Sequence, residues 1–129
     1  MIGIVVISHS EKIAEGIAET AKQMASEVKI VAVGGTDDGR IGTDVNKIVD
    51  GINKVYSEDG VLLFYDLGSA MMNAEMALEF LEEDKKKNVI IVDAALVEGV
   101  ISASVYANLD MDMDYILSEM EKIRINKRE

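Results

Sequence analysis

The feature that most constrains the fold is a set of four short apolar runs separated by long helical patterns. The runs are nearly continuous in branched and aromatic residues, and they cover Ile2–Ile7, Val28–Val33, Val61–Tyr65 and Val89–Val92. Such runs are typical of parallel strands that are buried on both faces, and the intervals between them are long enough for crossover helices. The pattern therefore predicts an α/β fold, a three-layer α/β/α sandwich around a four-stranded parallel sheet.

Helical periodicity fills the intervals and the end of the chain. We expect helices over residues 11–26, from Thr43-Asp44 onward, from Ser69 to the charged stretch 82–87, over 97–108 and over 113–124. The first helix should be capped by Ser10 and buried through Ile13, Ile17, Ala21 and Met24. We expect residues 126–129 to fray. The chain shows neither a repeat nor a linker, so we expect a single domain over residues 1–129.

Composition narrows the class of partner. The formal net charge is −11, which disfavours nucleic acid and anionic lipid because both need basic contacts. The chain has no cysteine, which excludes disulfides and thiol chemistry. It lacks a basic leader, and no apolar run approaches the roughly 20 residues of a membrane span. We therefore expect a cytoplasmic protein without a membrane or nucleic-acid partner.

Topology brings two polar segments together. Right-handed crossovers favour the strand order 2-1-3-4, in which the first and third strands are neighbours. Ligands of such sheets bind outside the carboxyl ends of these two strands. The first strand ends in Ser8-His9-Ser10, and the third ends in Asp66-Leu67-Gly68-Ser69. The only histidine should therefore lie beside a carboxylate and the start of a helix.

This combination favours phosphoryl transfer through His9. A carboxylate on one ring nitrogen fixes the imidazole tautomer and leaves the other nitrogen free to attack, so Asp66 on Nδ1 would leave Nε2 for the phosphoryl group. The phosphohistidine would need hydrogen-bond donors, which helix N-termini, the Ser69 hydroxyl, Ser8, Ser10 and the open backbone at Gly68 could supply. Each of these residue types is also common in loops and caps. The joint placement at one edge of the sheet is what favours the functional interpretation.

Two neighbouring features leave alternatives open. The glycine-rich stretch Gly34–Thr43 is neither a Walker A motif nor a dinucleotide fingerprint. It is either a flexible loop or a rim of the site that places Thr36 near the phosphate and Arg40 near an anion or a partner. Met71 and Met72 are either core residues or an adaptable docking patch.

Four segments, taken in order, carry a resemblance to a known family. They are the strand ending in Ser8-His9-Ser10, the stretch 41–44, the stretch 66–70 and the stretch 94–99. Together they resemble the phosphotransfer subunits of phosphoenolpyruvate-dependent dihydroxyacetone kinases, within the mannose-type enzyme IIA family of the bacterial phosphotransferase system.

The resemblance implies a complete role. His9 would take a phosphoryl group from the phosphocarrier HPr and pass it to ADP on the kinase's ADP-binding subunit, which works with a dihydroxyacetone-binding subunit. Asp66 would orient the ring, and Ser69 would contact the phosphate. Mg²⁺ and ADP would belong to the partner, so the chain would need no metal or cofactor of its own. The resemblance also implies a homodimer. Some relatives fuse an HPr-like domain behind this one, whereas here HPr would be a separate protein.

Other functions remain as alternatives. A mannose-type enzyme IIA of a sugar transporter is the first, although such relatives add a final strand where residues 113–124 look helical. A receiver-like switch phosphorylated on Asp66 would need acidic residues after the first strand, where Ser8-His9-Ser10 stands. A serine hydrolase is disfavoured by the missing Gly-x-Ser-x-Gly elbow. The last alternative is an interaction module without chemistry.

Overall fold

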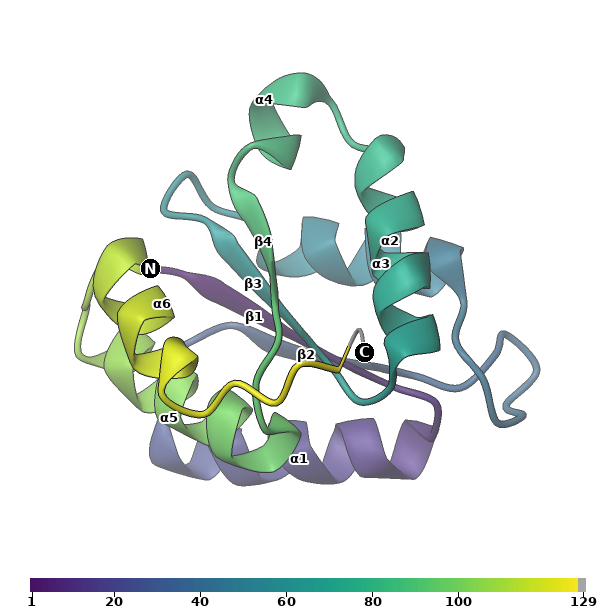
Figure 1. Cartoon of the computed structure of the whole chain (residues 1–129), viewed down its shortest axis with the longest axis horizontal. Coiled ribbons are helices and arrows are strands. Elements are labelled where there is room, and N and C mark those ends of the chain that lie inside the picture. The colour runs from purple at the N-terminus through teal and green to yellow at the C-terminus, as the bar shows by residue number, and fades with distance from the viewer. Residues whose placement is uncertain (128–129) are drawn as a thin grey trace.

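The computed structural model describes residues 1–127, which form one four-stranded sheet between two layers of helices (Figure 1). All strand pairs are parallel, in the order β2-β1-β3-β4. The strands are β1 (Gly3–Ser8), β2 (Ile30–Gly34), β3 (Val61–Tyr65) and β4 (Val89–Val92). The predicted fold class and strand order are confirmed.

The helices cover both faces of the sheet. On one face lie α1 (Glu11–Met24), α5 (Leu96–Asn108) and α6 (Met113–Glu121), and on the other lie α2 (Val45–Val55) and α3 (Gly68–Glu79). The short α4 (Glu83–Lys86) precedes β4. Within residues 1–127, no helix combines the length and the apolar character that crossing a membrane requires.

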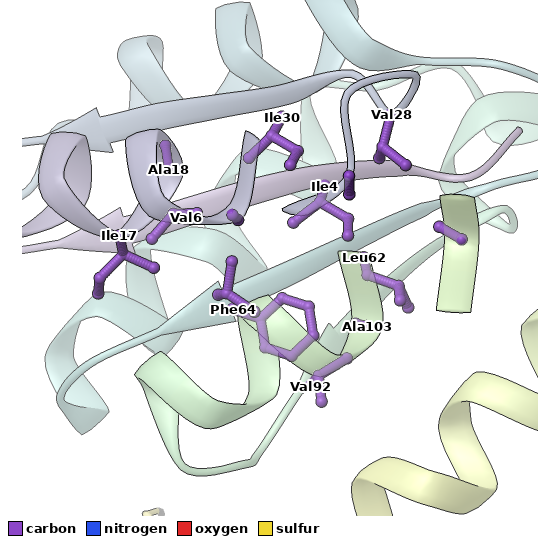
Figure 2. Packing of buried hydrophobic residues seen from close by; sticks show 14 of the residues in the cluster. Ile4, Val6, Ile17, Ala18, Val28, Ile30, Leu62, Phe64, Val92 and Ala103 are labelled. Carbon is purple, nitrogen blue, oxygen red and sulfur yellow. The ribbon is translucent and has the colours of Figure 1, made fainter. Parts of the chain in front are cut away.

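Alternation along the central strands divides the core in two. In β1, Ile4 and Val6 face α1 and α5, whereas Val5 and Ile7 face α2 and α3. Figure 2 shows the first of these cores, where the ring of Phe64 lies beside Val92 and Ala103. Because both faces of β1 and β3 are buried, the packing fixes these strands and the points at which the loops after them begin.

Strand register sets the geometry of the site. Ile7 of β1 pairs with Tyr65 of β3, so the next residues, Ser8 and Asp66, follow side by side. The period of two also makes both side chains continue the face of Val6 and Phe64. The sheet therefore delivers the two polar segments to one edge, as the sequence predicts.

Four predicted boundaries and one predicted face are wrong. α1 ends at Met24, two residues before its predicted end. β2 begins at Ile30, because the N–H of Val28 closes the turn after α1 on the carbonyl of Ala25 at 3.3 Å. The third helix stops at Glu79, and α4 is a separate helix; the last helix ends at Glu121. Ile13 and Met24 are 52% and 56% exposed. The buried face of α1 instead comprises Ala14, Ile17, Ala18 and Ala21.

The predicted fraying of the tail is wrong for Lys127. Its N–H donates to Asp93 Oδ2 at 2.9 Å, and its ammonium donates to the carbonyl oxygen of Tyr65 at 2.5 Å. Two interactions of this kind order a residue against the sheet. Residues 128 and 129 of that prediction lie outside the described part of the chain.

Gly3 provides a test of the packing between β1 and α2. A Cβ at this position would lie 2.2 Å from the carbonyl oxygen of Val55, the last residue of α2. We expect Gly3→Ala to lower the free energy of unfolding by about 1–3 kcal/mol, because backbone must move to admit the methyl group. In Gly16→Ala, the added Cβ meets nothing within 4 Å, so this helix variant should gain up to about 1 kcal/mol. Urea unfolding of both variants checks the pair, and a Gly3→Ala protein as stable as the parent would contradict it.

Candidate phosphoryl-transfer site

The imidazole of His9 is held from both sides at the carboxyl edge of the sheet. Its Nδ1 lies 2.9 Å from Asp66 Oδ1, and its Nε2 lies 2.7 Å from Ser69 Oγ. His9 follows β1, Asp66 follows β3, and Ser69 lies in the first turn of α3. The His9 side chain is 21% exposed, so the ring is fixed but still open to solvent. The structure thus brings together the three residues that the sequence singles out.

The Asp66 carboxylate accepts four hydrogen bonds. Oδ1 accepts from His9 Nδ1 and from the N–H of Leu67 at 2.7 Å, and Oδ2 accepts from the N–H of His9 at 2.9 Å and from Ser8 Oγ at 3.0 Å. Burial raises the pKa of Asp66, but these hydrogen bonds outweigh it and hold the pKa below the ordinary 3.8. Asp66 is therefore ionised at neutral pH.

The charge of Asp66 determines the tautomer of His9. An ionised carboxylate has no proton to give, so Nδ1 must carry the hydrogen of the bond between them. In the neutral ring Nε2 then holds a lone pair, which accepts the hydroxyl proton of Ser69. A hydrogen bond from a hydroxyl to a nucleophilic nitrogen is easily exchanged, since the hydroxyl can rotate toward an incoming oxygen. The arrangement presents Nε2 as a nucleophile with a donor beside it.

Ser8, expected as a possible donor to the phosphate, instead donates to Asp66. Its side chain is fully buried, donates to Asp66 and accepts the N–H of Ser10 at 3.1 Å. Ser8 therefore holds the carboxylate and does not line the open side of the ring. The alternation of side chains along a strand could have identified this role. Ser8 lies two positions after Val6, and Asp66 lies two positions after Phe64, so both side chains point to the same face of the sheet.

Ser10 and Gly68 occupy the starts of two helices. The Ser10 hydroxyl caps α1 by accepting the N–H of Ile13 at 3.3 Å, which confirms the predicted cap. Gly68 is the first residue of α3, and the side chain of Leu67 before it makes no capping hydrogen bond. Both N-termini begin beside His9, so their N–H groups favour an anion there. Contact of Ser10 or Gly68 with phosphate remains a prediction.

The loop Gly34–Thr43 adjoins the site through its backbone. The N–H of Gly42 donates to the carbonyl of His9 at 2.8 Å, and the N–H of Gly35 donates to that of Ser8 at 3.3 Å. The Thr36 hydroxyl is engaged inside the loop, donating to Asp38 at 2.5 Å. Arg40 Nε also bonds to Asp38, at 3.0 Å. The loop is thus a rim beside His9, but the structure does not bring Thr36 onto the ring, and its predicted contact with phosphate stays a prediction.

A second contact ties this rim to α3. The amide of Asn73 donates to the hydroxyl of Thr43, so the end of the loop is anchored one turn beyond Ser69. No local sequence pattern predicts this pairing, because it joins half-buried polar residues of two different segments.

The two methionines separate into core and surface. Met71 is 8% exposed and packs with α2, whereas Met72 is 65% exposed. Met76 of α3 and Phe80 at its C-cap follow Met72 at spacings of four residues, and they are 54% and 67% exposed. Only Met72 therefore fits the docking interpretation, and Met71 fits the core interpretation.

Among residues 1–127, no group of three or more His, Asp or Glu side chains is arranged to hold a metal ion. The arrangement fits a nucleophilic imidazole, oriented by a carboxylate and flanked by a hydroxyl and two helix N-termini.

Comparisons with known proteins agree on one family. A family model, EIIA-man, described as the PTS system fructose IIA component, matches residues 3–117. The phosphoryl donor subunit DhaM of PEP-dependent dihydroxyacetone kinase 2 from Listeria innocua is 40% identical, over 95% of this chain and 99% of that protein. The corresponding DhaM subunit of Escherichia coli is 38% identical over the whole chain, which spans 28% of that longer protein. A crystal structure of a protein of unknown function is 41% identical, with a TM-score of 0.85 over 97% of this chain and 96% of that one.

Proposed function

This chain belongs to the EIIA-man family, and we propose that it is the phosphocarrier of a phosphoenolpyruvate-dependent dihydroxyacetone kinase. The observation that carries the proposal is the His9 ring fixed between Asp66 and Ser69, in a chain 40% identical to a phosphoryl donor subunit. The carrier receives a phosphoryl group and delivers it to ADP on the kinase, where the regenerated ATP phosphorylates dihydroxyacetone.

Loading is a displacement at phosphorus. The Nε2 lone pair of His9 forms the new P–N bond while the P–N bond to the phosphohistidine of the donor, HPr, breaks, and that bonding pair returns to the donor imidazole. The ring of His9 becomes positively charged as Nε2 is phosphorylated, and Asp66 stabilises this charge through Nδ1–H. Ser69 rotates to donate to a phosphoryl oxygen. Such a transfer depends mainly on positioning and charge stabilisation.

Unloading reverses these roles. A β-phosphate oxygen of ADP attacks the phosphorus, the P–Nε2 bond breaks, and its electron pair returns to His9. We assign Mg²⁺ and ADP to the ADP-binding subunit of the kinase, which acts in complex with the dihydroxyacetone-binding subunit. We further propose that the carrier is a cytoplasmic homodimer, for which sedimentation equilibrium is the direct test.

Met72 offers a test of partner docking. It lies one turn along α3 from Ser69 with an exposed side chain, so a protein that reaches His9 should cover it. We expect Met72→Asp to slow loading by HPr at least several-fold, because a charge on this apolar patch would be desolvated. Met24→Asp is the control, since Met24 is similarly exposed at the far end of α1. Equal loading rates for the Met72→Asp protein and the parent would exclude Met72 from the docking surface.

The function is tested by reconstitution. Phosphoenolpyruvate, enzyme I and HPr should place one acid-labile phosphate on the protein, and added kinase subunits with ADP should consume it while dihydroxyacetone phosphate forms. Loading without transfer to the kinase would instead favour the alternative, an enzyme IIA of a sugar-transporting system. The absence of loading would contradict both.

A further inference from the structure

The segment after α6 brings a lysine to the turn that carries the transfer site. In Figure 1 this segment runs from α6 across the end of β4 toward the start of α3. The ammonium of Lys127 donates to the carbonyl of Tyr65. The backbone carbonyl oxygen of Lys127 lies 3.3 Å from the position that a Cβ on Gly68 would take. Tyr65 immediately precedes Asp66, and Gly68 immediately precedes Ser69. Lys127 thus reaches the neighbour of each side chain that holds His9.

Lys127 is also tied to the end of β4. Its N–H donates to Asp93 Oδ2 at 2.9 Å, directly after the last residue of this strand. Pairing between β3 and β4 ends at Phe64 and Val92. Beyond that pair, where the strands no longer bond to each other, Lys127 connects Tyr65 at the end of β3 to Asp93 after β4.

The ammonium is in an unusual environment for a lysine near the end of a chain. It lies 4.8 Å from the centroid of the Tyr65 ring, and the residue is half-buried. Burial lowers the pKa of Lys127 below its ordinary 10.5, while the charges of Asp93 and Asp66 act in the opposite direction. The Asp66 carboxylate is thus within electrostatic reach of the ammonium.

We propose that Lys127 is a positioning residue of the transfer site, which clamps the turn between β3 and α3 so that Asp66 and Ser69 stay on the two nitrogens of His9. Its bonds to Tyr65 and Asp93 and its approach to Gly68 restrain both ends of this turn. The inference rests on the proposed function. Because a displacement of about 1 Å at a reacting group can cost about 10²-fold in rate, a clamp remote from the ring matters to the chemistry.

The test compares three variants in the loading assay with HPr. Lys127→Met keeps the length of the side chain without the ammonium, and it should load about tenfold more slowly than the parent. Lys127→Arg should recover most of the rate, since a guanidinium can donate to the same carbonyl. Lys22→Met makes the same change of charge on an exposed lysine in the last turn of α1, and it should load at the parent rate.

A second readout separates positioning from general stability. The Nδ1–H of His9, which donates to Asp66, should exchange with water faster in Lys127→Met than in the parent, as measured by NMR of the ¹⁵N-labelled imidazole. Parent-like loading and exchange in Lys127→Met would overturn the inference, and so would an equal loss of rate in Lys22→Met. Failure of the proposed function looks different, because the parent itself would then not be loaded.

Discussion

The His9→Gln protein is expected to take up no acid-labile phosphate from phosphorylated HPr, whereas the parent takes up one per chain. Glutamine keeps a polar side chain at the end of β1 but has no nitrogen lone pair that can attack phosphorus. His9 is the only histidine of the sequence, so no second imidazole can replace it. The measurement is the incorporation of labelled phosphate after acid and after neutral quenching.

The control for His9→Gln is a comparison of its free energy of unfolding with that of the parent. The backbone N–H of His9 donates to Asp66, and the backbone of residue 9 is unchanged by the substitution. The His9→Gln protein should therefore unfold within about 1–2 kcal/mol of the parent. Labelling equal to that of the parent would remove His9 from the mechanism.

Asp66→Asn is expected to slow loading by up to about 10⁴-fold, the loss seen when the carboxylate that orients a catalytic imidazole is replaced by its amide. An amide has one accepting atom where the carboxylate has two. If its oxygen accepts from Nδ1–H, its NH₂ faces two donors, the N–H of His9 and the hydroxyl of Ser8. If the amide is turned the other way, its NH₂ donates to Nδ1 of His9. The ring proton must then be on Nε2, where it blocks the lone pair that attacks phosphorus. Initial loading rates at saturating HPr measure the loss.

The matched control is Asp112→Asn. Asp112 caps α6 by accepting the N–H of Tyr115 at 2.9 Å, and asparagine caps a helix about as well as aspartate. This variant should load at the parent rate. A parent-like rate in Asp66→Asn would show that orientation by the carboxylate is not needed.

Asp66→Asn should also change how the free energy of unfolding depends on pH. The pKa of Asp66 is held below 3.8 in the folded protein, so its ionised form stabilises the fold above the unfolded value. This contribution is lost as the pH falls through the folded pKa. The free-energy gap between the parent and Asp66→Asn should therefore be full at pH 7 and shrink below about pH 4.

Much of the site follows from sequence because two strong rules determine it. Continuous apolar runs identify the parallel strands, and the reversal of winding between the first and third strands identifies the edge at which a ligand binds. His9 and Asp66 directly follow those strands, so their approach depends on topology rather than on loop conformation. Ser69 is included because a short turn connects β3 to α3.

The remaining features depend on contacts that no local pattern encodes. Periodicity misplaced the buried face of α1, because small alanines at Ala14 and Ala18 pack against the sheet while the larger Ile13 and Met24 stay outside. The position of Thr36 in the glycine-rich loop predicts a place near the phosphate, but its hydroxyl donates to Asp38. Lys127 reaches Tyr65 across 62 positions of sequence, and only the folded chain brings them together.

The most direct test of the account is NMR of the phosphorylated protein, with the imidazole of His9 labelled with ¹⁵N. The account predicts phosphorus coupled to Nε2, with the proton retained on Nδ1 by Asp66. Phosphorus coupled to Nδ1, or a phosphate that resists acid and lies on another side chain, would contradict it.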